Sequence, residues 1–268
     1  MKYFSRQFKQ NYFKVGLFAC LALLLCAAQP VRAELISASA TIDWSTFKIT
    51  PIDTGNGLPS LIWNNQDDYS RESLFFRDSV DETASNWSTG TSVAEIASES
   101  TVITSASAST SVNEIKADAS ISGSIPNPLY LAESSSQRYG NFTVQGNGRL
   151  LFQANYNLAA EANSSLGISA SSHSLATFSL SSSSNAGDVQ AFSKEIFGGS
   201  SALTETGVFS AALDFQDGST GNFGTFVKTE ISSFKAFYIP LPPAFWLFGS
   251  SLAGIIALRR KISASLLS

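Results

Sequence analysis

Between residues 34 and 239, apolar and polar side chains alternate with the two-residue period of β-strands far more often than with helical spacing. In the clearest run, LISASATIDWSTF, every second side chain is apolar: Ile36, Ala38, Ala40, Ile42 and Trp44. One face of this strand, including Trp44, is expected in a core and the other in water, as in an antiparallel sheet. A weaker alternation over 102–108 and small residues over 168–180 predict two more strands.

Two stretches have the pattern of a hairpin, in which a short turn separates two alternating runs. In NFTVQGNGRLLFQANYNL, the runs 142–144 and 150–158 flank the sequence GNG, whose residues tolerate positive φ. The runs 209–215 and 223–231 flank the turn sequence DGSTGN in the same way. We therefore predict two β-hairpins.

Residues 53–92 do not follow this pattern. The sequence LIWNNQDDYSRESLFFRDSVDE mixes aromatic and acidic residues, and it is predicted to be a long insertion or to hold a short helix over 70–77. Several short strands with glycine-rich turns predict an all-β fold, an antiparallel, jelly-roll-like β-sandwich. No long linker divides the serine-rich residues 34–238, so we expect one domain there.

The first 33 residues have the three regions of a secretory signal peptide. A basic stretch is followed by the apolar run VGLFACLALLLCAA and by Val31-Arg32-Ala33, with small side chains where signal peptidase reads them. Cleavage after Ala33 leaves Glu34 as the first mature residue. An uncleaved anchor is the alternative, but the apolar run is short for a membrane span.

The C-terminal sequence IPLPPAFWLFGSSLAGIIALRRK has a different organisation. Residues 244–258 carry no charge and span about 22 Å as a helix, less than the roughly 30 Å of a hydrocarbon core. A basic cluster that acts as a stop-transfer signal follows: Arg259, Arg260 and Lys261. A stiff, extended proline motif precedes the helix: Pro240, Leu241, Pro242 and Pro243.

Charge and cysteine content limit the function of the exported region. Five of the 17 basic residues precede Glu34 and three follow Leu258, which leaves nine against all 21 acidic residues, a net charge of −12. Such a surface repels nucleic acid. Both cysteines, Cys20 and Cys26, lie in the predicted signal peptide, so the mature chain has no disulfide, thiolate metal site or cysteine nucleophile.

The candidates for catalysis and metal binding are few. His173 is the only histidine, and it lies in a serine tract with no nucleophile-elbow motif beside it. Asp53-Thr54-Gly55 matches the aspartic-protease loop, but no second copy occurs, and the same residues are ordinary turn formers. We therefore predict no enzymatic activity, cofactor or catalytic metal. Two separate groups offer oxygen atoms for a weak calcium site: Asp214, Asp217 and Asn222 in DFQDGSTGN, and the pair Asp67-Asp68. Ordinary exposed turn residues are the alternative.

Two tryptophans in loop-like sequence, Trp63 and Trp87, are candidates for stacking on sugar rings if they are exposed. A carbohydrate-binding module is therefore the alternative to an inert matrix protein.

The C-terminal segment resembles the PEP-CTERM sorting signal of Gram-negative bacteria, in its Val-Pro-Leu-Pro-Ala variant. The resemblance is carried by Pro240-Leu241-Pro242, by the Trp-Leu-Phe-Gly-Ser stretch that starts at Trp246, and by the basic cluster. Ile239 replaces the valine of the variant, and Pro243 precedes Ala244. The resemblance implies processing by an exosortase and an exopolysaccharide or biofilm setting.

Four regions are expected: a signal peptide (1–33), an exported β-sandwich (34–238), a sorting signal with a transmembrane helix (239–262) and a short tail (263–268). The expected partners are the Sec translocon, signal peptidase, an exosortase, transiently the inner membrane, and extracellular polysaccharide. The predicted product is a structural or adhesive protein of the cell surface or extracellular matrix. A permanent single-pass anchor is the alternative.

Overall fold

The computed structural model describes residues 34–74, 77–99, 101–123, 129–163, 168–183 and 188–235. Within these ranges the chain has no helix long and apolar enough to cross a membrane. The described residues form twelve strands: β1 (Glu34–Ile52), β2 (Ser60–Leu74), β3 (Val80–Ala84), β4 (Thr91–Glu99), β5 (Val102–Thr110), β6 (Glu114–Gly123), β7 (Leu129–Gln145), β8 (Gly148–Asn163), β9 (Ile168–Ser182), β10 (Val189–Gly198), β11 (Leu203–Phe215) and β12 (Thr220–Lys235).

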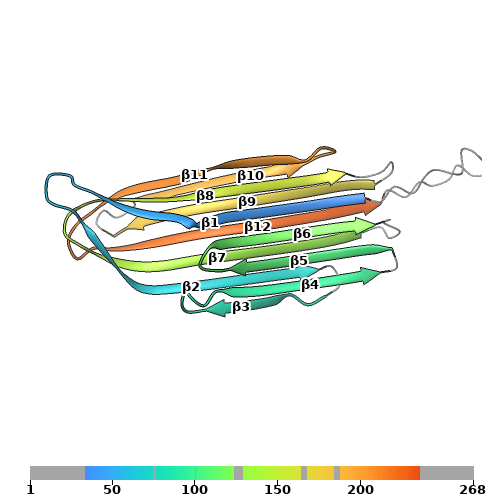
Figure 1. Ribbon diagram of the computed structural model, residues 1–268, viewed down its shortest axis with the longest axis horizontal. Coiled ribbons are helices and arrows are strands. Elements are labelled where there is room, and N and C mark those ends of the chain that lie inside the picture. The colour runs from blue at the N-terminus through green and yellow to red at the C-terminus, as the bar shows by residue number, and fades with distance from the viewer. Residues whose placement is uncertain are drawn as a thin grey trace, which may run out of the picture.

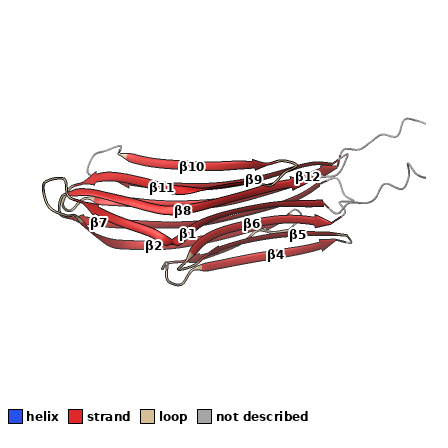
Figure 2. Ribbon diagram, turned by 45° about the horizontal axis from the view of Figure 1, so that its top comes forward, coloured by secondary structure: helices blue, strands red, loops and turns tan. Residues whose placement is uncertain are grey.

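The strands form two six-stranded antiparallel sheets that face each other in an elongated sandwich (Figures 1 and 2). Sheet A has the order β11-β8-β1-β6-β5-β4, and sheet B has the order β10-β9-β12-β7-β2-β3. The predicted antiparallel sandwich is confirmed, although it has more strands than the eight of a jelly roll. The first strand, β1, and the last, β12, both lie inside their sheets and not at an edge.

The described chain enters and leaves the sandwich at one end. The first residues of β1 pair with the last of β6, and the last residues of β12 pair with the first of β7. Ile36 of β1 and Ile231 of β12 belong to the same apolar cluster. Figure 1 shows this terminal end on the right. The opposite, distal end holds the connections 53–59, 146–147 and 216–219.

Both predicted hairpins are wrong. β7 lies in sheet B and β8 in sheet A, so the glycine turn between them crosses from one sheet to the other. The connection from β11 to β12 crosses in the same way. Hairpins instead join β4 to β5, β5 to β6 and β9 to β10. A hairpin and such a corner have the same sequence pattern, because side chains that face the core alternate identically in both.

The predicted insertion or helix within residues 53–92 is also wrong, because residues 60–74 form β2 beside β7. The inward positions of β2 hold Asp68, Ser70 and Glu72, none more than 2% exposed. Buried polar side chains at these positions remove the apolar alternation by which a strand is recognised.

The interior contains two apolar clusters with a band of buried polar side chains between them. The larger cluster, toward the distal end, is rich in aromatic residues, including Phe142, Phe152, Phe178 and Phe223. At a bulge in β1 between Asp43 and Lys48, the rings of Trp44 and Phe47 stack on each other with centroids 4.0 Å apart. Both rings are partly buried against this cluster. The core position predicted for Trp44 is therefore confirmed.

The polar band consists of side chains that are almost wholly inaccessible: Asp68, Ser70, Thr110, Ser134, Ser136, Arg138, Thr225 and Thr229. Ser134 and Ser136 of β7 each donate a hydrogen bond of 2.8 Å across the sandwich, to the carbonyl oxygens of Asp118 and Lys116 of β6. Because β7 belongs to sheet B and β6 to sheet A, these bonds join the two layers.

Candidate functional site

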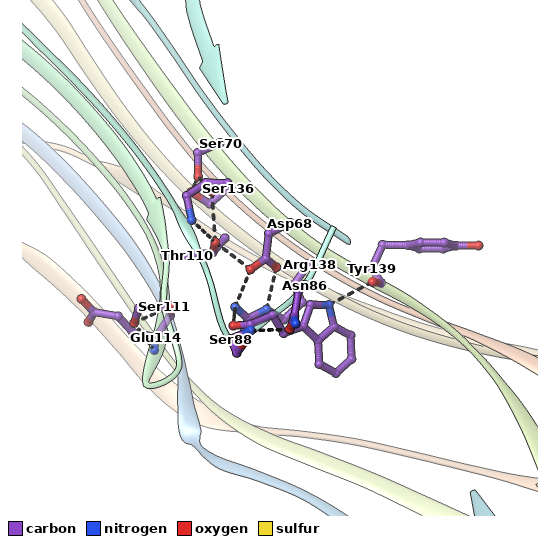
Figure 3. Close-up of polar contacts among 12 residues, drawn as sticks. Asp68, Ser70, Asn86, Ser88, Thr110, Ser111, Glu114, Ser136, Arg138 and Tyr139 are labelled. Carbon is purple, nitrogen blue, oxygen red and sulfur yellow. Dashed lines mark hydrogen bonds and ion pairs between the residues drawn. The ribbon is translucent and has the colours of Figure 1, made fainter. Parts of the chain in front are cut away.

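At the centre of the polar band, Arg138 of β7 and Asp68 of β2 form an ion pair with no solvent exposure, in which Nη1 of Arg138 is buried without a hydrogen-bond partner. Nε of Arg138 donates to Oδ1 of Asp68 and Nη2 donates to Oδ2, both at 2.7 Å, a two-point contact that fixes both side chains. Thr110 of β5 donates to the same Oδ2 at 2.9 Å, so both sheets contribute to the cluster (Figure 3).

Hydroxyl groups and aromatic rings complete this cluster. Ser70 shares hydrogen bonds with Thr91 of β4 (2.6 Å), which again connects the sheets, and with Ser136 of the neighbouring strand β7 (3.1 Å). The guanidinium carbon of Arg138 lies 4.6 Å from the ring centroid of Trp44, within the range of a cation–π contact. A buried charge is tolerated only when it is paired in this way. We assign the cluster a structural role, because both charged groups are sealed from solvent.

The two tryptophans proposed to stack on sugar lie side by side, with ring centroids 4.6 Å apart. Trp87 follows β3 in a turn, but only 8% of it is exposed, and its Nε1 donates to the carbonyl oxygen of Tyr139 at 3.1 Å. Trp63 is partly buried against the larger apolar cluster. A Cβ at Gly140 would lie 2.6 Å from Trp63, so glycine leaves room for these rings. Trp87 lies in a turn, but the exposure that sugar stacking requires is not met.

The surface is hollowed at the distal end, where the three connections meet. This distal hollow has a volume of about 530 Å³, within the usual range for small-molecule sites of about 300–1,000 Å³. Its polar lining comes from Thr54, Asn56, Asn147, Arg149, Asp214 and Gln216.

Reciprocal hydrogen bonds hold the two crossing turns together at this end. Oδ1 of Asp217, between β11 and β12, accepts the backbone N–H of Gly146 at 2.7 Å. Oδ1 of Asn147 accepts the backbone N–H of Asp217 at 2.9 Å in return. Gly146 has φ of 82°, a conformation that glycine adopts without strain. The turns beside the hollow are therefore fixed relative to each other before any ligand arrives.

The third connection is built in a similar way. Oδ1 of Asp53 accepts the backbone N–H groups of Gly55 at 2.7 Å and of Gly57 at 3.1 Å, and both glycines have positive φ. This confirms that Asp53-Thr54-Gly55 is turn chemistry. Thr54 and Asn56 reach the hollow from this loop.

The charged group of the hollow is an exposed ion pair between neighbouring strands. Nε of Arg149 (β8) donates to Oδ1 of Asp214 (β11) at 2.9 Å, and Nη2 donates to Oδ2 at 2.7 Å. The hydrogen bond from Arg149 lowers the pKa of the Asp214 carboxyl, which therefore stays ionised well into the acid range. The pair presents adjacent hydrogen-bond donors and acceptors to solvent without net charge.

In each of the two groups proposed for calcium, carboxylates are already engaged by other parts of the protein. Asp68 is sealed in the interior, Asp214 is paired with Arg149, and Asp217 holds the crossing turns. Among the described residues, no group of three or more His, Cys, Asp or Glu side chains is placed to hold a metal ion.

His173 lies on the outer side of β9. Its Nε2 is 3.3 Å from Oε2 of Glu195, and its ring stacks on Phe197 of β10 with centroids 4.5 Å apart. Its polar neighbour is thus a carboxylate on the adjacent strand and not a serine nucleophile.

Two other surface features lie on the outer faces of the sheets. A smaller hollow of about 380 Å³ lies on the outer face of sheet A, with Asp43, Asn155 and Asn157 in its lining. On the outer face of sheet B, the ring of Tyr139 is held by its hydroxyl group, which donates to Oδ1 of Asn141 at 2.7 Å. Both hollows bring together segments that are 50 or more residues apart in the chain, so sequence reasoning missed them.

Several predicted residues lie outside the described ranges. These are the signal peptide through Ala33, the motif Pro240, Leu241, Pro242 and Pro243, and the cluster Arg259, Arg260 and Lys261. Glu34, the predicted first mature residue, is the first residue of β1.

Comparisons with known proteins give no family. No protein-family model matches the chain, and no curated protein matches it significantly. Among solved structures, the N-terminal CBM22-1–CBM22-2 tandem domain of Paenibacillus barcinonensis Xyn10C aligns at 6% identity over 76% of this chain and 79% of that one, with a TM-score of 0.12. A TM-score this low supports no inference about fold or function.

Proposed function

We propose that this chain is an exported, non-enzymatic protein of the cell surface or extracellular matrix, with a structural or adhesive role. One observation carries the proposal: the described sandwich, Glu34–Lys235, has a predicted processing signal on each side of it in the sequence. The predicted signal-peptide cleavage site precedes Glu34, and the proline motif starts at Pro240.

The export route follows from these signals. The chain crosses the inner membrane through the Sec translocon, and signal peptidase cleaves after Ala33. The C-terminal helix then holds the chain briefly in the membrane, until an exosortase cleaves near Pro240-Leu241-Pro242-Pro243. Because the chain leaves the sandwich at the terminal end, a membrane-held protein would direct its distal end away from the bilayer (Figure 1).

The test replaces Pro240, Pro242 and Pro243 with alanine in a chain that carries one epitope tag after Glu34 and another after Ser268. In a host with an exosortase, we expect the unchanged proline motif to give a product that has lost the C-terminal tag and left the membrane fraction. The alanine variant should keep both tags and stay in the membrane. Retention of both tags in the membrane by the unchanged chain would instead show a permanent single-pass anchor.

A further inference from the structure

We propose that the distal hollow binds hydroxyl groups of a neutral polysaccharide. The inference rests on the proposed adhesive function and specifies its ligand. It places sugar recognition at the connections of the distal end and not at Trp63 and Trp87.

The lining of the hollow matches the chemistry of a polyol. Arg149 has five N–H donors and uses two on Asp214, whose carboxylate keeps further lone pairs. The pair therefore places donors and acceptors side by side, the arrangement that two adjacent sugar hydroxyls require. The carboxamides of Asn56 and Gln216 and the hydroxyl of Thr54 add groups that both donate and accept.

The charge in and around the distal hollow favours a neutral glycan over an anionic one. Arg149, the basic residue of the lining, is neutralised by Asp214. Asp53 and Asp217 stabilise the adjoining turns, and the exported region as a whole has a net charge of −12. A uronate or sulfate group would meet this negative field with no free cation in the lining to offset it.

The hollow is also preorganised. Asp53 fixes the loop that carries Thr54 and Asn56, and the bonds between Asp217, Gly146 and Asn147 fix the opposite wall. A rigid site loses less conformational entropy on binding than a mobile one, so a few hydrogen bonds suffice for measurable affinity. Loops held on a rigid scaffold are a common place for binding groups.

The experiment measures binding of the purified exported protein to immobilised neutral glycans (glucans, mannans and galactans) and to alginate as an anionic control. Arg149→Ala and Asn56→Ala each remove hydrogen bonds to the ligand, so we expect binding to fall about tenfold or more, the equivalent of about 1.4 kcal/mol. The unfolding temperature should hardly change, because the Arg149–Asp214 pair is exposed and contributes little to stability.

Matched controls lie on the other two surfaces. Asn157→Ala changes the hollow on sheet A, and Tyr139→Ala removes the ring on sheet B. Both should bind as the unchanged protein does. The proposal is overturned if Arg149→Ala and Asn56→Ala bind normally, if a control variant alone loses binding, if only alginate binds, or if no neutral glycan binds. Processing at the proline motif is assayed separately, so failure here leaves the proposed export route standing.

Discussion

Among single side chains, Arg138 and Asp68 are the most sensitive to substitution, because each is a full charge without access to water. Their mutual hydrogen bonds and the Trp44 ring offset part of the lost hydration, although Nη1 of Arg138 has no hydrogen-bond partner. Removal of one partner leaves the other charge buried and unpaired, which typically costs about 3–5 kcal/mol.

We therefore expect Arg138→Met and Asp68→Leu each to lower the free energy of unfolding by about 3–5 kcal/mol in urea titrations. The double variant should lose much less than the two single losses combined, since it leaves no unpaired charge. Additive losses would show that the pair is not coupled.

Glu72 is a second buried ionisable side chain, and it has no ion-pair partner like that of Asp68. Both of its carboxylate oxygens are buried without a hydrogen-bond partner, as is Oε2 of Glu95. Burial raises the pKa of Glu72 from its ordinary value of 4.5, and the Glu95 carboxylate raises it further. The N–H of Val80 and the charge of Arg77 act in the opposite direction. The folded protein therefore holds this proton more tightly than the unfolded chain does.

The sign of the pH effect follows from that difference. The stabilisation by protonated Glu72 is complete below the unfolded pKa, near 4.5, and is lost as pH rises through the raised pKa of the folded state. We expect Glu72→Gln to be more stable than the unchanged protein at pH 7, by about 1–3 kcal/mol. Its melting temperature should also depend less on pH between 4.5 and 7. Glu161→Gln, on the outer side of β8, is the control; a lower melting temperature for Glu72→Gln at pH 7 would refute the prediction.

At the scale of elements, the four edge strands are protected against pairing with other molecules. Lys194 of edge strand β10 lies opposite buried Ala176, on the inner face of sheet B, but at the open edge its side chain stays half exposed and contacts Glu205 of edge strand β11 at 3.4 Å. Gln190 of β10 accepts the backbone N–H of Ala212 in β11 at 2.8 Å. On the other side, Glu82 of β3 accepts the N–H of Ser92 in β4 at 2.7 Å. Inward charges and capped N–H groups of this kind oppose edge-to-edge association.

Lys194→Val should therefore promote self-association, because it leaves an apolar edge beside the exposed Phe192 on the same face of β10. We expect light scattering after size-exclusion chromatography to show dimers or larger species for this variant. Lys116→Val, on the central strand β6, is the control and should remain as the unchanged protein. Identical elution of Lys194→Val would mean that the charge does not protect the edge.

The success of sequence reasoning also differs between elements. The alternation in β1, β8, β9, β11 and β12 was recognised because their inward positions are mostly apolar or small. β2 was missed, since Asp68, Ser70 and Glu72 look like surface residues in a sequence. Their burial depends on partners that are distant in the chain, such as Arg138 and Thr110. The distal hollow is not predictable for a related reason. The sequence predicts both crossing turns as hairpins, and two separate hairpins give no reason to expect that their turns lie side by side.

For the whole molecule, stability depends on strands from both ends of the described chain. β1 lies between β8 and β6, and β12 lies between β9 and β7, so each completes the middle of its sheet. A chain that ends before Thr220 should fail to form the sandwich. Its circular dichroism and proteolysis pattern should be those of an unfolded protein, whereas a chain that ends after Lys235 should fold. A cooperative melt for the shorter chain would contradict this dependence.

The central place of β12 also sets the timing of folding in the proposed export route. It is the last of the described strands to be synthesised and translocated. In sheet B it is also the strand that joins β9 and β10 on one side to β7, β2 and β3 on the other. Sheet B therefore stays in two halves until residue 235 has emerged, when the next segment to arrive is the proline motif. Completion of the domain and delivery of its processing signal would thus coincide, so that the enzyme meets a substrate that has just become compact.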